Sequence, residues 1–412
     1  MKILCVLGKY NYGDPRRGLS HEYCNFIPAM RRLGHEVVFF DSKDRTWFNN
    51  FRDLNAALLS IVEQEKPNIL FSVLTHYEIW RETLCLLRDE GSVATVNWTT
   101  DDSWRYESFS RFVAGVFHAM TTTYPQAYAK YKRDGFSNVL LTQWAANAET
   151  LREPLPASRC KYPVSFIGTA HGNRKQWIAA LKERGIEVAC FGYGWDSGPI
   201  PSEEIPRVIR ESVISLNFAN SALVWERGVL PRRHNQIKAR VFEVCGAGGF
   251  LLTEWAPGIE KYYIPDQEIV VFKTIDELTQ KISYYLTHPS ERDAIAIAGF
   301  ERTQREHTYD NRMAEVIEFT LRCWDEYRKN HASHSLNSSL QQQFAQIAQQ
   351  HQLNIALKLI KRFLLSLCIT IWGPERGPRA ARRLIFELSW RVAGAKTYSA
   401  SGWPGRMFYE VS

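Results

Sequence analysis

The sequence predicts an α/β protein built from two consecutive parallel-sheet domains and a helical extension at the carboxyl end. Short apolar runs alternate with segments whose apolar residues recur at helical spacing, which is typical of βαβ units. The proline-rich stretch TLREPLPASRCKYP, at 150–163, interrupts this alternation, and a basic segment follows the second series. These observations predict domains of residues 1–155 and 156–330 and a tail of 331–412.

The apolar runs predict the strands of both sheets. In the first domain they lie at 2–7, 36–41, 68–73, 93–98 and 138–142, and in the second at 164–168, 187–192, 213–218, 249–253 and 268–272. Parallel α/β domains bind ligands at the carboxyl ends of their strands, so we expect the working site in a cleft between the domains.

Composition narrows the class of protein. With 45% hydrophobic and 23% charged residues among 412, the chain can bury substantial cores. The eight cysteines form no Cys-x-x-Cys pair and no cluster with zinc-ligand spacing, so we expect neither a metal site nor disulfides. No apolar segment reaches the roughly 20 residues that a membrane-spanning helix needs. We expect a cytoplasmic location.

The net charge of +7 is concentrated in the tail. Residues 331–412 carry ten basic and three acidic residues, whereas the first 330 are balanced, which argues against a nucleic-acid binder. Residues 333–352, rich in Ser, Gln, Asn and His, are expected to form a linker. Residues 353–392 then predict two apolar and basic helices, which could bind an anionic membrane surface at its inner face or cover an apolar patch of the protein or of a second subunit.

In the first domain, a glycine-bearing turn follows the first predicted strand. Gly13 and Gly18 precede a helix, where backbone N–H groups could contact a ligand, although an ordinary connection fits equally well. The stretch NWTTDDSWRYE then places Asp101 and Asp102 among aromatic residues at the end of a strand. One aspartate could cap the next helix, or either could bind a hydroxyl or act as a general base. His21 competes for that catalytic role.

The second domain has two candidate anion-binding segments. Gly168 and Arg174 lie in a strand–turn–helix segment, where a basic first turn opposes the helix dipole unless an anion is bound. Lys238, Arg240 and Glu243 precede a Gly-rich turn that contains Gly248. Arg240 and Glu243 could form a simple intrahelical ion pair, or the basic residues could bind a diphosphate and the carboxylate a ribose.

Several separated motifs, in order, resemble a known family. They include LGHEVVFFD, NWTTDDSWR, VSFIGTAHGNR and QIKARVFEVCGAGGFLLTE, and the resemblance covers roughly residues 1–330. The chain resembles the CgeB-type (spore maturation protein B-like) glycosyltransferases, which are related to the group 1 glycosyltransferases of GT-B fold. The resemblance implies two Rossmann-like domains, the second holding a nucleotide-sugar donor and the first presenting an acceptor.

The same resemblance implies roles for individual residues. Glu243 looks like the ribose-binding glutamate, Arg240 and Lys238 like diphosphate contacts, and Gly168 with Arg174 like the donor-side loop. Related group 1 enzymes often carry a second glutamate where this chain has Asn235, so the stereochemical outcome stays open.

The implied activity is that of a hexosyltransferase-like enzyme. It would move a sugar from a nucleotide-diphosphate sugar to a glycan, lipid-linked glycan or protein, with neither cofactor nor metal. The alternatives are a non-catalytic binding or scaffold protein of the same shape and a nucleotide-sugar epimerase.

Overall fold

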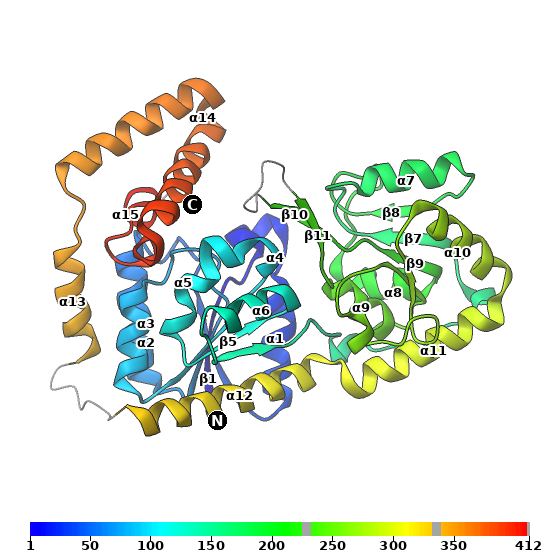
Figure 1. Cartoon of the computed structure of the whole chain (residues 1–412), viewed down its shortest axis with the longest axis horizontal. Helices are drawn as coiled ribbons and strands as arrows, with labels where there is room; N and C mark the ends of the chain where they lie inside the picture. Colours follow the sequence, from blue (N-terminus) through cyan, green and yellow to red (C-terminus); the bar gives the residue numbers. More distant parts are fainter. Residues whose placement is uncertain (225–231, 332–338, 410–412) are drawn as a thin grey trace. The chain divides into compact units, whose positions relative to one another are not determined.

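A computed structural model describes residues 1–224, 232–331 and 339–409 of the chain. It divides into two compact units (Figure 1). The first unit consists of Met1–Thr122, Gln126–Leu141 and Glu315–Ser412, and the second of Thr123–Pro125 and Thr142–Ala314. The tail that follows the second unit therefore belongs to the first.

The first unit contains a six-stranded parallel sheet with the order β2-β1-β3-β4-β5-β6. Its strands are β1 (Lys2–Leu7), β2 (Glu36–Asp41), β3 (Ile69–Ser72), β4 (Ala94–Trp98), β5 (Ala119–Thr122) and β6 (Val139–Leu141). Because β2 and β3 lie on opposite sides of β1, the sheet has a switch point between β1 and β3, where such folds bind ligands. Among the strands of this sheet, β5 was not predicted, because its residues AMTT are fully buried but weakly apolar.

Helices flank this sheet. They are α1 (His21–Arg32), α2 (Phe51–Glu65), α3 (Arg81–Glu90), α4 (Asp102–Arg105), α5 (Arg111–Val113) and α6 (Pro125–Arg133), and a π-helical turn, η3 (Tyr106–Ser110), joins α4 to α5. Side chains cap the longer ones: Ser20 Oγ accepts the N–H of Tyr23 at 3.2 Å at the start of α1. The capping fixes where each helix begins after its strand.

The second unit repeats this plan with five parallel strands in the order β13-β12-β9-β7-β8. They are β7 (Tyr162–Ile167), β8 (Ala189–Phe191), β9 (Ser212–Asn217), β12 (Leu251–Glu254) and β13 (Val270–Phe272). An antiparallel pair, β10 (Asn220–Val224) and β11 (Arg232–Asn235), follows β9. The switch point of this sheet lies between β7 and β9.

The helices of the second unit are α7 (Arg174–Glu183), α8 (Ile205–Arg210), α9 (Ala239–Gly246), α10 (Ile275–Thr287) and α11 (Pro289–Glu306). The buried Arg292 of α11 donates to Leu155 O at 2.9 Å and to Val213 O at 2.7 Å. A buried guanidinium with these partners fastens the proline-rich segment to the second unit.

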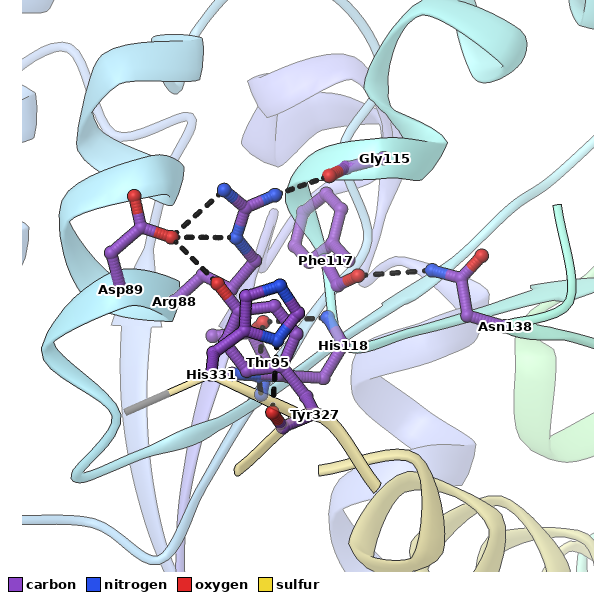
Figure 2. A network of polar contacts seen from close by, with 9 residues as sticks. All are labelled: Arg88, Asp89, Thr95, Gly115, Phe117, His118, Asn138, Tyr327 and His331. Carbon is purple, nitrogen blue, oxygen red and sulfur yellow. Dashed lines mark hydrogen bonds and ion pairs between the residues drawn. The ribbon is translucent and has the colours of Figure 1, made fainter. Parts of the chain in front are cut away.

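Helix α12 (Tyr309–Asn330) contributes residues to both units, and its carboxyl end is bound to the first. Figure 2 shows the polar network at that end, where the Tyr327 hydroxyl donates to Asp89 Oδ1 at 3.0 Å. Arg88 Nε donates to the same oxygen at 2.8 Å, and the Tyr327 ring lies 4.9 Å from that of His118. The network holds the returning chain against the amino-terminal edge of the sheet.

Three further helices, α13 (Leu340–Gln350), α14 (Ile355–Ala393) and α15 (Trp403–Phe408), complete the first unit. The expectation of a linker over 333–352 is wrong at α13, where Ser339 caps the helix and Phe344 is buried and stacks on Trp80 at 5.5 Å. Leu340, Phe344 and Ala348 form a buried stripe at four-residue spacing, which stabilises the helix despite its glutamines. Residues 332–338 lie outside the described part of the chain.

Helix α14 turns back on itself at Gly373, whose φ of 79° is left-handed (Figure 1). The two arms approach so closely that a Cβ on Gly377 would lie 2.6 Å from Ile369 Cα. The second arm and α15 lie against the first unit, where Tyr409 packs edge-on against Phe51 at 4.2 Å. Among the described residues, no helix combines the length and hydrophobicity needed to cross a bilayer.

Candidate functional site

In the second unit, charged residues gather at the carboxyl edge of the sheet, beside its switch point. Gly168 directly follows β7, and Arg174 begins α7 with only 9% of its surface exposed. A Cβ on Gly168 would lie 3.0 Å from Phe166 Cζ and 3.4 Å from Arg174 Nη1, so the glycine packs beside both side chains. Arg174 Nη1 donates to Thr169 O at 2.9 Å, while its Nε has no partner among the described residues. The guanidinium therefore retains an unused buried donor.

The environment of Arg174 disfavours its charged form. Burial and the positive charge of Arg240 lower the pKa of Arg174 to about 10, and the carboxylate of Glu254 partly offsets them. Three elements, α7, α9 and β12, thus bring two guanidinium groups and a carboxylate together. Two cations and an unused donor in one place suit a polyanionic ligand.

Helix α9 brings Arg240 and Glu243 to the same edge, because its amino terminus follows the β10–β11 pair. Arg240 Nη1 and Glu243 Oε2 form the intrahelical ion pair that the sequence allowed, at 2.9 Å with side chains 21% and 26% exposed. Lys238 occupies the N-cap position with extended backbone and makes no side-chain cap bond. Arg240 interacts with Arg174 as well, so the ion pair belongs to a larger charged cluster.

Glu254, which the sequence analysis did not single out, completes this cluster. It ends β12 and is buried, and it accepts the Ala219 N–H at 2.8 Å and Asn235 Nδ2 at 3.2 Å. Burial raises the pKa of Glu254, while these hydrogen bonds favour its charged form. Glu254 directly follows the predicted strand 249–253, and this position was the signal that could have identified it.

Gly248, predicted with the donor-binding residues, lies elsewhere. It precedes β12 and so occupies the amino-terminal edge of the sheet, opposite Gly168. Its φ is +77°, and a Cβ there would lie 2.4 Å from Arg152 O. Close packing against the protein's own backbone therefore accounts for this glycine, and the structure does not bring it to the cluster.

In the first unit, Asp102 is closed off from solvent, with 2% of its surface exposed. It accepts hydrogen bonds from Thr99 Oγ1 at 2.8 Å, Ser110 Oγ at 2.5 Å and the Tyr131 hydroxyl at 3.2 Å. Burial raises the pKa of Asp102. Because hydroxyl groups occupy both carboxylate oxygens, this environment favours a structural role over the predicted catalytic one.

The other predicted residues of the first unit lie at the carboxyl edge of its sheet. Asp101 follows β4 with φ 52°, a left-handed conformation that is strained for a non-glycine residue. His21 begins α1. Gly13 lies against Lys43, whose carbonyl oxygen would be 3.1 Å from an added Cβ, whereas Gly18 has open space around it. These residues belong to separate loops that follow β1 and β4.

Two unpredicted residues, His76 and Arg105, share that edge. His76 follows β3 in the sequence THYE, and Arg105 ends α4. Positive charge from Arg105 contributes to lowering the pKa of His76 well below its ordinary value, after burial, which has the largest effect. The position of His76 shortly after the predicted strand 68–73 was the available signal for this residue, whereas Arg105 lies farther from a predicted strand.

Comparisons with known proteins agree with this architecture. A family model described as glycosyl transferase-like matches residues 174–318, the segment that carries Arg174, Arg240, Glu243 and Glu254. Spore protein CgeB of Bacillus subtilis (strain 168) is 20% identical over 236 residues, which cover 53% of this chain and 73% of CgeB. The chain is thus similar to the CgeB-type glycosyltransferases.

Solved structures show that this glycosyltransferase has the GT-B fold. Sucrose-phosphate synthase from Thermosynechococcus elongatus superposes with a TM-score of 0.54 at 13% identity, covering 81% of this chain and 100% of the synthase. Anabaena HepE, in complex with UDP, superposes with a TM-score of 0.51 at 10% identity, covering 77% of this chain and 100% of HepE. The prediction of two α/β domains with a helical carboxyl-terminal extension is confirmed.

Proposed function

We propose that this glycosyltransferase binds a nucleoside-diphosphate sugar at the carboxyl edge of the second unit and transfers the sugar to an acceptor held by the first, with no metal or cofactor. The observation that carries the proposal is the cluster of Arg174, Arg240, Glu243 and Glu254 beside the switch point. The crystal complex of HepE with UDP makes UDP the first nucleotide to test.

The cluster suits the leaving group of the reaction. Transfer breaks the bond between the sugar C1 and the diphosphate oxygen, and negative charge grows on the departing diphosphate. Arg174 and Arg240, together with Lys238 and the amino termini of α7 and α9, supply fixed positive charge to stabilise it. Glu243 would accept hydrogen bonds from the ribose hydroxyls. Pairing with Arg240 holds Glu243 in place before the nucleotide binds.

On the acceptor side, Asp101 and His21 remain the proposed candidates for activating the acceptor hydroxyl. Asp101 is the stronger candidate, because its strained backbone directly after β4 is a feature that clusters at functional sites. The acceptor would be a glycan, a lipid-linked glycan or a protein.

Nucleotide binding tests the donor assignment. Full-length protein is titrated with UDP, GDP, ADP, CDP and TDP, with and without EDTA, and melting temperature is recorded. One nucleotide should stabilise the protein irrespective of EDTA, and Glu243→Ala should reduce its affinity about 10-fold or more. Glu211→Ala is the matched control, because Glu211 forms a surface ion pair with Arg207 at 3.2 Å in the same unit. Absence of any stabilisation, or equal loss in both variants, would contradict the proposal.

We further propose that the first arm of α14 binds an anionic membrane surface, in line with a lipid-linked acceptor. Apolar side chains at four-residue spacing are exposed along this arm, including Ile355 at 77%, Phe363 at 68% and Ile371 at 58%. Arg362 on the same arm and Arg379 on the second are also exposed, which gives the charge complementarity that anionic lipid requires.

Vesicle sedimentation tests the membrane proposal. Vesicles with phosphatidylglycerol should retain the protein better than pure phosphatidylcholine vesicles, and Phe363→Ser should weaken retention. Tyr193→Ser is the control, because Tyr193 is 56% exposed in the second unit. Equal binding to both vesicle types, or self-association that Phe363→Ser abolishes without vesicle binding, would refute it.

A further inference from the structure

A second charged group lies in the first unit, at the carboxyl edge of its sheet beside the switch point. The loops after β1, β2 and β3 meet there, and they bring Lys43 and His76 to this edge. Helix α4 adds Arg105, and the second arm of α14 adds Arg382. The ionisable side chains that lower the pKa of His76 are all basic: Arg105, Arg382 and Lys43.

Lys43 and His76 are held in place by specific contacts. A Cβ on Gly8 would lie 2.6 Å from Lys43 Cδ, so the glycine at the end of β1 accommodates the lysine side chain. The N–H of His76 donates to Glu78 Oε2 at 2.7 Å. The His76 ring lies 5.8 Å from that of Phe386 on α14. These contacts place Lys43 and His76 at this edge.

Arg105 gives the strongest indication that this edge binds an anionic ligand. Its surface is 6% exposed, and its Nη2 has no hydrogen-bond partner in the described part of the chain. The guanidinium lies 4.7 Å from the Phe109 ring, which contributes attraction but accepts no conventional hydrogen bond. A buried unsatisfied donor is costly, and an oxyanion is the partner that best satisfies a guanidinium.

Nearby carboxylates do not fill that need. Glu78 accepts the N–H groups of Thr75 and His76, each at 2.7 Å. Asp102 is occupied by the hydroxyl groups described above. Glu78, Asp101 and Asp102 do balance part of the Arg105 charge. Even so, three basic side chains, Lys43, Arg105 and Arg382, surround the His76 imidazole. The Asp41 carboxylate faces Lys43 from the end of β2.

We propose that this edge recognises an anionic group, a phosphate or a carboxylate, on the acceptor saccharide. The inference deepens the proposed function, because it names the chemical class of the acceptor. Arg105 and Lys43 would bind the anion, His76 would contact it through its ring, and Arg382 would complete the site. Because Arg382 belongs to α14, the tail supplies part of acceptor recognition.

Arg382 is linked to this edge through neighbouring aromatic residues. It interacts with the Tyr77 hydroxyl, and the Tyr77 ring lies 6.0 Å from that of Phe386, four residues further along α14. Arg383, the next residue, is exposed. The two arginines therefore provide a test variant and a matched control on one helix.

The experiment follows the His76 ring by NMR in the full-length protein, with saturating UDP present so that phosphate cannot occupy the second unit. The signal is assigned by its absence in His76→Gln. Glucose 6-phosphate and glucuronate should each shift it and raise the pKa of His76, and glucose should do neither. A response to only one of the two acids identifies the anion. Arg382→Ala should weaken the response about 10-fold, whereas Arg383→Ala should leave it unchanged.

The result that overturns the proposal is distinct from failure of the donor assignment. No shift with either acid, or an equal response to glucose, refutes anion recognition even if UDP binds normally. An unchanged response in Arg382→Ala refutes the role of the tail. If the wild-type protein does not bind UDP, the donor site is refuted instead. The two sugar acids are then titrated without UDP, so that anion recognition is still tested.

Discussion

Replacing Arg174 by Met should stabilise the ligand-free protein while weakening nucleotide binding. Burial and the charge of Arg240 lower the pKa of Arg174 from its ordinary value to about 10. A shift of this size corresponds to a cost of ~3 kcal/mol for keeping the group charged. Met keeps the apolar stem but loses the hydrogen bond to Thr169 O, worth ~1 kcal/mol. The net gain in unfolding free energy should be about 2 kcal/mol.

Two measurements on each variant test this reasoning. Urea denaturation without nucleotide should show the higher free energy of unfolding. Thermal denaturation should show a melting temperature that is roughly 4–8 °C higher for a unit of this size. Titration with the stabilising nucleotide should show a loss of affinity of about 30-fold, because a charge-assisted hydrogen bond to phosphate contributes ~2 kcal/mol.

Lys175→Met is the control for Arg174→Met. Lys175 is the next residue of α7 and is exposed, so its replacement should change neither quantity appreciably. A variant at Arg174 that is less stable and yet binds nucleotide normally would show that the guanidinium is an ordinary structural group. The charged cluster would then lose its functional interpretation.

Two other variants test the first unit. Burial and, to a smaller degree, Arg88 lower the pKa of His118 to about 4, so the folded protein keeps this ring neutral while the unfolded chain protonates near its ordinary pKa of 6.5. The free energy of unfolding should therefore rise with pH between about 4 and 6.5, by up to ~3 kcal/mol. Urea titrations at several pH values should show a smaller rise for His118→Gln. The control His288→Gln, at an exposed histidine, should show the same rise as the wild-type protein. Asp102→Asn should lower the free energy of unfolding by about 1–3 kcal/mol and leave kcat per folded molecule unchanged, and a large loss of kcat at full stability would restore the catalytic interpretation.

The strand pattern was predictable because buried parallel strands are continuous apolar runs, and each of the predicted runs corresponds to a strand. Strand β5 was not predicted because its residues AMTT are fully buried but weakly apolar. The Thr122 side chain hydrogen-bonds to the buried carboxylate of Asp102. Helix α13 was not predicted because its many glutamines make the segment polar on average, although it has a narrow apolar stripe.

The candidate sites were only partly predictable, for a physical reason. Arg174, Arg240 and Glu243 could be found because each lies near a glycine-bearing turn in the sequence. Glu254 follows a predicted strand, but its burial and its hydrogen bond from the Ala219 N–H are seen only in the structure. Arg105 becomes notable through a buried donor that has no partner among the described residues. The opposite holds for Asp102: its sequence context suggests a catalytic role, but in the structure hydroxyl groups hydrogen-bond to its carboxylate.

The return of the chain to the first unit has a consequence for its synthesis. The second unit is nearly continuous, so it can close soon after residue 314 leaves the ribosome. The first unit is translated earlier, but its folding is complete only after Tyr398 and Tyr409 have been synthesised. These two residues pack on Phe109 and Phe51, respectively. At roughly 5–20 residues per second, the apolar surface of its nascent helices stays uncovered for several seconds after the second unit is complete. The part translated first is therefore the part finished last, and it is the one that most needs protection from premature aggregation.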